Sequence, residues 1–550
     1  MGIERTNPSI FHTWATLAAV SLGIFAITLD GCMMPVAIGS IINGLNTEVG
    51  FVQAAMAVHS LVMASMYLTA GKLAQRLGEK RIFVTGAVIF AAGTLVAAVS
   101  PDVWVLLLGW SLIKPIGGAM MIPAAGSLIV LNYEGRQRST AFSIFSAFVA
   151  AAAVIGPIWM GLVAGAFSWR WAFASESLII ALLLFFAGMV KEAPRLKTVS
   201  FDWVGALISF AGLGLIVLGA TLAGEFGWLQ ARRPFYVGEQ VFAPWGLSAA
   251  LVFIATGAMA MLLFVWWSDR RSRLGRATLF QMGLLKNRLF SCGAALGFLF
   301  QLTVGGLLFV LPVFLQSALQ LNAMDTALVL CPYTLGIFIF ALAATRLPET
   351  FPAGRIIQAG LVLMLAGGVW VYQTASLELA WKTLVPALFC FGAGAGLVLA
   401  RMTEVTLSTL APDELSEGTG GDSTGKELGV AFGVSVLGSI FLLMVYGHVV
   451  DTYDAYHNLP TATVEDRNRA VVELEDWASQ VSNTQWQAHL AGLPQNTANA
   501  YNAIVNSAYL KGYRDMLRIL IGAIVAMLMV SLLMKQREKK RKSRSDATIT

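Results

Sequence analysis

The sequence has little charge. Asp, Glu, Lys and Arg make up only 12% of its 550 residues, whereas soluble domains carry about 25%. Hydrophobic residues account for 57% of the chain and the mean hydropathy is +0.71. Several apolar runs exceed the roughly 20 residues that cross a hydrocarbon core about 30 Å thick. This composition excludes a soluble globular protein. Because backbone groups in lipid need hydrogen-bond partners within the chain, the apolar runs are predicted to be helices, which gives an all-α polytopic membrane protein.

Cysteine and histidine are also scarce. The four cysteines lie inside apolar runs, which predicts small packing residues and excludes a disulfide or metal framework; they are Cys32, Cys292, Cys331 and Cys390. The five histidines offer no clustered metal site, and no nucleophile motif stands out. We therefore expect no enzyme activity, no catalytic residue, no metal and no cofactor.

Apolar runs separated by polar segments predict fourteen transmembrane spans. An even count places both termini on the same side of the membrane. The predicted spans lie near residues 15–39, 51–70, 82–99, 103–131, 139–167, 170–190, 203–224, 247–267, 289–316, 325–345, 356–374, 383–408, 418–446 and 515–534.

The basic residues predict the orientation, because cytoplasmic loops are enriched in Lys and Arg. Of the 37 Lys and Arg residues, 25 fall in segments on the side of the termini and 8 in the opposite segments. Both termini are therefore predicted to be cytoplasmic, in a cytoplasmic (inner) membrane. The tail "KQREKKRKSR" directly follows the last span, where it is expected to fix orientation and attract anionic lipid, not nucleic acid.

One outer segment is the only sizeable soluble piece that the sequence predicts. It covers about 447–513, and its stretch "VEDRNRAVVELEDWASQV" has the spacing of a short amphipathic helix. We predict that this segment covers the outer face of the protein.

The loop between the second and third predicted spans is short and basic. It reads "GKLAQRLGEKR" from Gly71 to Arg81, and it resembles the signature loop of the major facilitator superfamily, G-x-x-x-D-R-x-G-R-[RK]-[RK]. Gln75 stands where the family has an aspartate that helps to latch the outward-facing state, so this latch is expected to be weaker or differently built. The residues that match are Gly71, Arg76, Gly78, Lys80 and Arg81.

The fifth span contains "VIGPIWMGLVAG", which resembles the G-P-x-x-G-G motif of the superfamily's antiporters. Pro157 removes a backbone donor and can bend the helix, whereas Gly156, Gly161 and Gly165 are expected to allow close helix approach. Two further stretches, "SWRWAF" and "FDWVGALISFAGLGLIVLG", are similar to the fourteen-helix drug:proton antiporters.

This resemblance covers nearly the whole chain and implies two six-helix bundles that rock about a central site, with two extra spans between them. It divides the sequence into four parts: a first bundle at 1–195, the additional spans at 196–275, a second bundle at 276–534 that includes the outer loop 447–513, and a basic cytoplasmic tail at 535–550.

The first span places an aspartate inside an apolar run. The family motif L-D-x-T-I-V-N-V-A-L-P aligns with "LDGCMMPVAIG". Asp30 is kept, whereas Pro35 replaces the asparagine and Gly39 replaces the terminal proline. In relatives this aspartate is implicated in proton coupling or in recognising cationic substrates, and the resemblance implies the same for Asp30.

The fourth span departs further from its motif, R-x-x-Q-G-x-G-A, which aligns with "SLIKPIGGA". Ser111 occupies the position of the arginine, and Lys114 lies three residues later, nearly one helical turn away. Two roles stay open for Lys114. Either it supplies the missing charge in a proton relay, or it recognises an anion.

Three more ionisable residues lie within spans, where such residues are costly and usually face a cavity or pair with one another. Glu176 in "WRWAFASES" has no local partner and is, with Asp30, a candidate for protonation. Arg401 and Glu404 are spaced i, i+3, so they either satisfy each other or belong to the substrate site. The stretch "GGDSTGKELG" resembles a phosphate-binding loop but lacks the hydroxyl residue after its lysine, so it predicts no ATP site.

The leading functional prediction is a proton-coupled antiporter that exports amphipathic or drug-like compounds by alternating access, with the proton gradient as its energy source. The alternative is an exporter of one endogenous anionic metabolite, such as a siderophore, which Lys114 and Arg401 motivate. The expected partners are a small-molecule substrate, protons and membrane lipid. Some relatives use a periplasmic adaptor, but no feature of this sequence indicates one.

Overall fold

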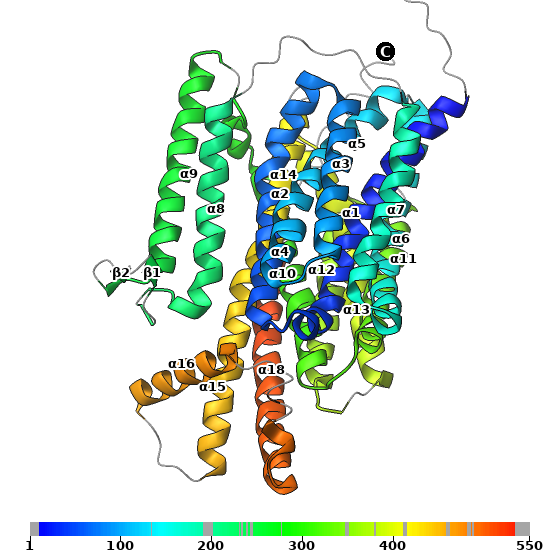
Figure 1. Cartoon of the computed structure of the whole chain (residues 1–550). Coiled ribbons are helices and arrows are strands. Elements are labelled where there is room, and N and C mark those ends of the chain that lie inside the picture. Colours follow the sequence, from blue (N-terminus) through cyan, green and yellow to red (C-terminus); the bar gives the residue numbers. More distant parts are fainter. Residues whose placement is uncertain are drawn as a thin grey trace, which may run out of the picture.

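The computed structural model is almost entirely helical (Figure 1). It describes residues 10–533 except 134, 191–201, 230, 233–234, 238–239, 242–245, 277, 347–350, 379–380, 411–414, 458–462, 481–485 and 487–488. Within this part, fourteen helices are long and apolar enough to cross a membrane. The predicted number of spans and the all-α fold class are therefore confirmed. The predicted tail 535–550 lies outside the described residues.

The first group of helices carries three of the candidate charged residues, Asp30, Lys114 and Glu176. Side chains cap two of these helices: Asp102 accepts from Val105 N, and Ser168 accepts from Arg170 N. A π-helical segment, η1, continues directly into α5. The elements are α1 (Ile10–Leu45), α2 (Val49–Leu77), α3 (Glu79–Ala98), α4 (Val103–Leu106), η1 (Leu107–Ile113), α5 (Lys114–Asn132), α6 (Gly135–Ala166) and α7 (Trp169–Gly188).

The next two helices, α8 (Trp203–Phe226) and α9 (Ala249–Arg273), form a close pair beside α2 (Figure 1). Glycine permits this pairing, because a Cβ on Gly219 would lie 2.7 Å from Ala250 O. Two short antiparallel strands, β1 (Tyr236–Val237) and β2 (Gln240–Val241), lie in the connection between the helices.

The remaining helices form the second half of the chain. Both α10 and α11 contain an internal proline, at Pro312 and Pro332. The elements are η3 (Met282–Lys286), α10 (Arg288–Ser317), α11 (Ala323–Arg346), α12 (Ala353–Thr374), α13 (Trp381–Leu407), α14 (Leu415–Phe432), the π-helical η4 (Gly433–Leu437), α15 (Gly438–Tyr456), α16 (Val464–Gln480) and α18 (Gln495–Leu533).

Two of these helices extend beyond their predicted spans. The prediction ended one span near residue 446 and began the last near 515, but α15 continues to Tyr456 and α18 begins at Gln495. At 1.5 Å per residue, the 39 residues of α18 span about 58 Å, well beyond a hydrocarbon core of about 30 Å. Both extensions project from one end of the molecule (Figure 1). Both helices continue into polar sequence, and a span boundary set by hydropathy marks only the end of the apolar run.

The amphipathic helix predicted in the outer segment is present as α16. It packs against α15, and Arg467 Nε lies 2.7 Å from Asp451 Oδ1. Its covering role on the outer face stays a prediction.

Candidate functional site

The centre of the site is a carboxylate from the first span. Asp30 lies in α1 with only 1% of its surface exposed. Lys114, the first residue of α5, and Glu176, in α7, are both fully buried. Lys114 Nζ lies 2.5 Å from Asp30 Oδ1 and 2.6 Å from Glu176 Oε2. We call Asp30, Lys114 and Glu176 the charged triad.

Aromatic residues surround the cation of the charged triad. Lys114 Nζ lies 4.8 Å from the centre of the Phe90 ring and 5.1 Å from that of Phe173. Rings at this distance attract a cation through their quadrupole. They also keep water away from the ion pairs, so the charges interact in a medium of low dielectric.

The charged triad is unbalanced in charge. Two ionised carboxylates and one ammonium would leave a net charge of −1 in a buried site. In addition, Glu176 Oε1 has no hydrogen-bond partner among the described residues. An excess charge of this kind is costly to bury, so the arrangement suits the uptake of one proton.

A tryptophan and a histidine extend the charged triad. Trp110 Nε1 donates to Asp30 Oδ1 over 2.8 Å. The ring of His59, from α2, stacks on Trp110 with 4.3 Å between their centres, and its Nδ1 lies 2.9 Å from Trp110 O. Since a carbonyl only accepts, Nδ1 carries the proton in this contact.

Sequence reasoning missed both Trp110 and His59. Each gives a signal in the sequence. A histidine inside a span is an ionisable residue at a costly position, and a buried tryptophan needs a partner for its ring N–H. Neither signal names the partner, because Trp110 and His59 are 51 residues apart.

Ser111, at the position of the family's arginine, and Lys114, three residues later, have different surroundings. Ser111 is buried within η1, and its Oγ has no hydrogen-bond partner among the described residues. Lys114 makes the contact with Asp30. The cation that contacts Asp30 therefore comes from position 114 and not from position 111.

Arg401 and Glu404 lie apart from the charged triad, near the end of α13. Arg401 Nη1 lies 2.7 Å from Glu404 Oε2, and Arg401 Nη2 donates to Ala344 O over 2.7 Å. The side chains are 21% and 58% exposed. These two residues satisfy each other, as one of the two sequence interpretations expected.

The phosphate-loop-like stretch is helical, since it lies within α14. Its Lys426 pairs with Asp422 one turn earlier and donates to Thr403 Oγ1 over 2.6 Å. In this helix Lys426 is therefore engaged by an acidic side chain one turn away and by a threonine hydroxyl.

The loop between α2 and α3 is a single tight turn. Gly78 separates the two helices with φ +109°, a conformation that favours glycine. Lys80 Nζ donates to Val190 O over 2.5 Å, which ties the loop to the end of α7. Gly71 lies within α2, and Arg76 and Arg81 are exposed. The side chain of Gln75 is outside the described set.

Two of the three glycines in the stretch that resembles the antiporter motif lie at helix contacts. A Cβ on Gly156 would lie 2.9 Å from Cys32 Cβ in α1, and one on Gly161 would lie 2.9 Å from Met324 Cα in α11. Pro157 lies inside α6. The expectation for the third glycine is wrong, because Gly165 has open space beside it.

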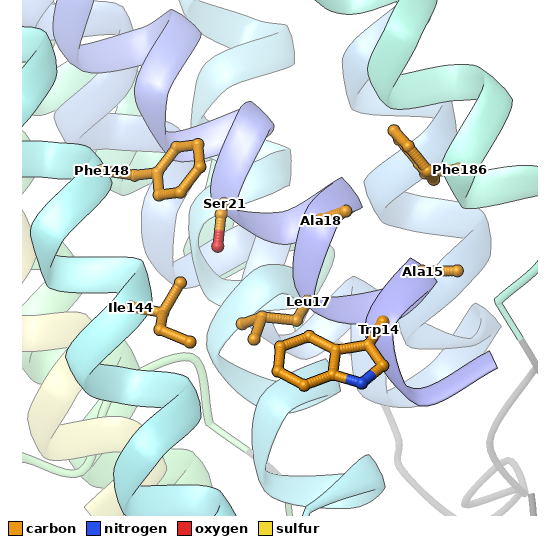
Figure 2. A pocket seen from close by; sticks show the side chains of 8 residues that line it. All are labelled: Trp14, Ala15, Leu17, Ala18, Ser21, Ile144, Phe148 and Phe186. Atoms are coloured by element: carbon orange, nitrogen blue, oxygen red, sulfur yellow. The ribbon is translucent and has the colours of Figure 1, made fainter. Parts of the chain in front are cut away.

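An apolar groove of about 280 Å³ lies apart from the charged triad, between α1, α6 and α7 (Figure 2). Ser21 is its one polar side chain, and Trp14 at its edge is 58% exposed. The groove is lined by Trp14, Ala15, Leu17, Ala18, Ser21, Ile144, Phe148 and Phe186. It lies near the start of α1, on the side that is predicted to be cytoplasmic.

Comparison with known proteins adds an independent line of evidence. Residues 20–286 match the family described as Major Facilitator Superfamily. The chain is 26% identical over 501 residues to the "Probable actinorhodin transporter" of Streptomyces coelicolor, covering 90% of this chain and 81% of that protein. It is 25% identical to the "Tetracenomycin C resistance and export protein" of Streptomyces glaucescens, covering 91% and 87%.

A solved structure shows the same fold. It is that of a bacterial homolog to the human lysosomal transporter Spinster, in an inward-facing and unoccupied conformation. The TM-score is 0.56 at 14% identity, covering 97% of this chain and all of that one. At this identity the likeness concerns the fold alone.

Proposed function

Because the chain belongs to the Major Facilitator Superfamily of membrane transporters, we propose that it is a proton-coupled antiporter that exports amphipathic or drug-like compounds. Export proceeds by alternating access across the cytoplasmic membrane, with both termini in the cytoplasm. Two relatives whose names describe a transporter and a resistance and export protein support export of antibiotic-like compounds.

One observation carries the proton coupling: a single ammonium lies between two buried carboxylates. With Asp30, Lys114 and Glu176 all ionised, the site has a net charge of −1. Burial of an ion without a compensating partner costs on the order of several kcal/mol. One proton on a carboxyl group removes the excess negative charge. A substrate that supplies positive charge or hydrogen-bond donors near the site can then release that proton.

The proton gradient supplies enough free energy for export. One proton that crosses 100 mV provides about 2.3 kcal/mol, and each pH unit adds about 1.4 kcal/mol. For one proton per uncharged substrate, 100 mV and one pH unit together give about 3.7 kcal/mol; for a monovalent cation the electrical contributions cancel. Since 1.4 kcal/mol is tenfold in an equilibrium constant, this sum supports a gradient of several hundredfold.

In the proposed cycle, substrate from the cytoplasm or the inner leaflet binds and a proton leaves the charged triad. The bundles then rock, the substrate leaves on the outer side, and a proton from outside restores the starting state. The apolar groove supports access from the membrane, because an amphipathic compound can bury its apolar part there.

Anionic-metabolite export has less support. It requires free cations to recognise the anion, but Lys114 already contacts two carboxylates, and Arg401 is engaged by Glu404 and a carbonyl. An anion would have to displace these fixed partners.

The test uses purified protein in vesicles that contain a pH-sensitive dye. Lipophilic cations and anionic siderophore-like compounds are added separately. We expect a lipophilic cation to trigger proton movement in the parent protein, and Asp30→Asn and Glu176→Gln to reduce this movement strongly. The matched control is Asp102→Asn, at a helix cap outside the charged triad, where asparagine also caps well.

Unchanged coupled transport in both Asp30→Asn and Glu176→Gln would refute the assignment of the proton site. A proton signal that only anions trigger would instead favour the anionic-metabolite exporter.

A further inference from the structure

Helix α2 contacts both π-helical segments of the described chain. One segment, η1, lies next to Lys114, and the other, η4, lies between α14 and α15 in the predicted second bundle. In each case a side chain from α2 binds a backbone carbonyl of the π-helical segment. Short π-helical stretches occur frequently at functional sites.

The contact with η1 has a cause in the sequence. In an α-helix, Trp110 O would accept from the N–H of Lys114, but that N–H bonds to Gly109 O. The next residue, Pro115, has no N–H to offer. Trp110 O is therefore available, and the buried His59 Nδ1 donates to it.

The contact with η4 crosses to the predicted second bundle. Gln53 Nε2 lies 3.0 Å from Val434 O, 2.8 Å from Ser435 O and 3.0 Å from Ser439 Oγ. Gln53 is 3% exposed. Gly438 makes room for it, since a Cβ at that position would lie 2.8 Å from Gln53 Nε2.

Gln53 and His59 are six residues apart on one helix, which is about 9 Å along its axis. His59 also stacks on Trp110, whose ring N–H donates to Asp30. Buried contacts therefore connect the charged triad to His59 at one point of α2 and Gln53 to η4 at another, and the helix itself joins the two points. Loss of either side chain would leave buried carbonyl groups without these partners.

We propose that α2 couples the charge of the triad to the docking of the second bundle, with His59 and Gln53 as its positioning residues. The inference rests on the proposed function, because it requires a charge change at Asp30 during transport. When Asp30 loses its charge, its hydrogen bond with Trp110 weakens, the ring and carbonyl of Trp110 shift against His59, and α2 moves relative to η4.

The experiment measures distances between spin labels on the predicted outer side, in protein whose four native cysteines are replaced by alanine. One label is placed at the exposed Val99 and the other at the exposed Leu377, so that the pair reports the separation of the bundles. A second pair, Val99 and Phe167, lies within the first bundle and serves as reference. Asp30→Asn imitates the uncharged state.

We expect Asp30→Asn to change the ratio of short to long Val99–Leu377 distances at least about fivefold, the lower end for allosteric coupling. When Asp30→Asn is combined with His59→Leu or with Gln53→Leu, we expect it to change this ratio less than about twofold relative to the leucine variant alone. The distances of the reference pair should stay the same in all variants. The control is Ser65→Ala, since Ser65 is buried in α2 but bonds only to Val62 O in its own helix.

A response to Asp30→Asn that persists in both leucine variants overturns the inference and leaves the proposed function intact. If Asp30→Asn leaves the Val99–Leu377 distances unchanged when His59 and Gln53 are both present, both the role of Asp30 and the inference are overturned. Gly438→Ala gives a second route if a leucine variant does not fold, because it displaces Gln53 without removing it. A full response in Gly438→Ala also contradicts the inference.

Discussion

Replacement of Lys114 by methionine tests the charged triad directly. Methionine keeps the apolar stem and much of the volume, so packing should change little. The two carboxylates, however, lose the cation that lies 2.5 and 2.6 Å from them. Removal of one partner from a buried ion pair costs about 3–5 kcal/mol, and we expect Lys114→Met to lower the free energy of unfolding by an amount in this range.

The penalty should depend on the carboxylates. Lys114→Met combined with Glu176→Gln should lose less stability than Lys114→Met alone, since one buried charge is gone. The fully neutral triple variant, which adds Asp30→Asn, should recover further stability because no buried charge remains, although its buried amide groups still need hydrogen-bond partners. Lower pH should also reduce the penalty of Lys114→Met, since protonation removes charge from the carboxyl groups.

Thermal unfolding in detergent at several pH values measures these differences, with Ser65→Ala as a control outside the charged triad. The reasoning would be refuted if Lys114→Met lost less than about 1 kcal/mol, the range of an exposed pair. It would be refuted equally if Glu176→Gln made Lys114→Met still less stable.

Gly39→Pro, which restores the family residue, should slow export at least tenfold in vesicles, because Gly39 N donates to Gln316 Oε1 over 2.5 Å; parental export would contradict this. Gly161→Leu should prevent close contact of α6 with α11 and raise reactivity of labels at that interface, whereas unchanged reactivity would argue against a tight contact. Glu404→Ala should change stability by less than about 1 kcal/mol in thermal unfolding, since the pair with Arg401 is partly exposed; a larger loss would assign this pair a structural role.

The fourteen spans could be predicted because each is a long apolar run, and such runs have few alternatives in lipid. The extents of α15 and α18 could not. Outside the hydrocarbon, a polar helix and a polar loop have similar hydropathy, and only packing between helices decides between them. The pair of α16 with α15 through Arg467 and Asp451 illustrates this, since it joins residues 16 positions apart.

The members of the charged triad were recognisable one by one as costly ionisable residues in spans. Their partnership was not, because Lys114 and Glu176 are 62 residues apart and no sequence spacing relates them. The i, i+3 pair of Arg401 and Glu404 shows the contrast, since local spacing already offered that contact as one of two interpretations.

One departure from the family pattern, Gly39, takes part in a contact between the two halves of the chain. Gly39 offers an N–H that proline lacks, and Gln316 from α10 accepts it and donates to Val36 O over 3.1 Å. Gln53 makes the reverse contact, from α2 to η4. Each half of the chain therefore presents a glutamine to the backbone of the other. Such bonds are directional and can be exchanged for water, so they can break and reform as the halves separate. A purely apolar contact would not impose this register.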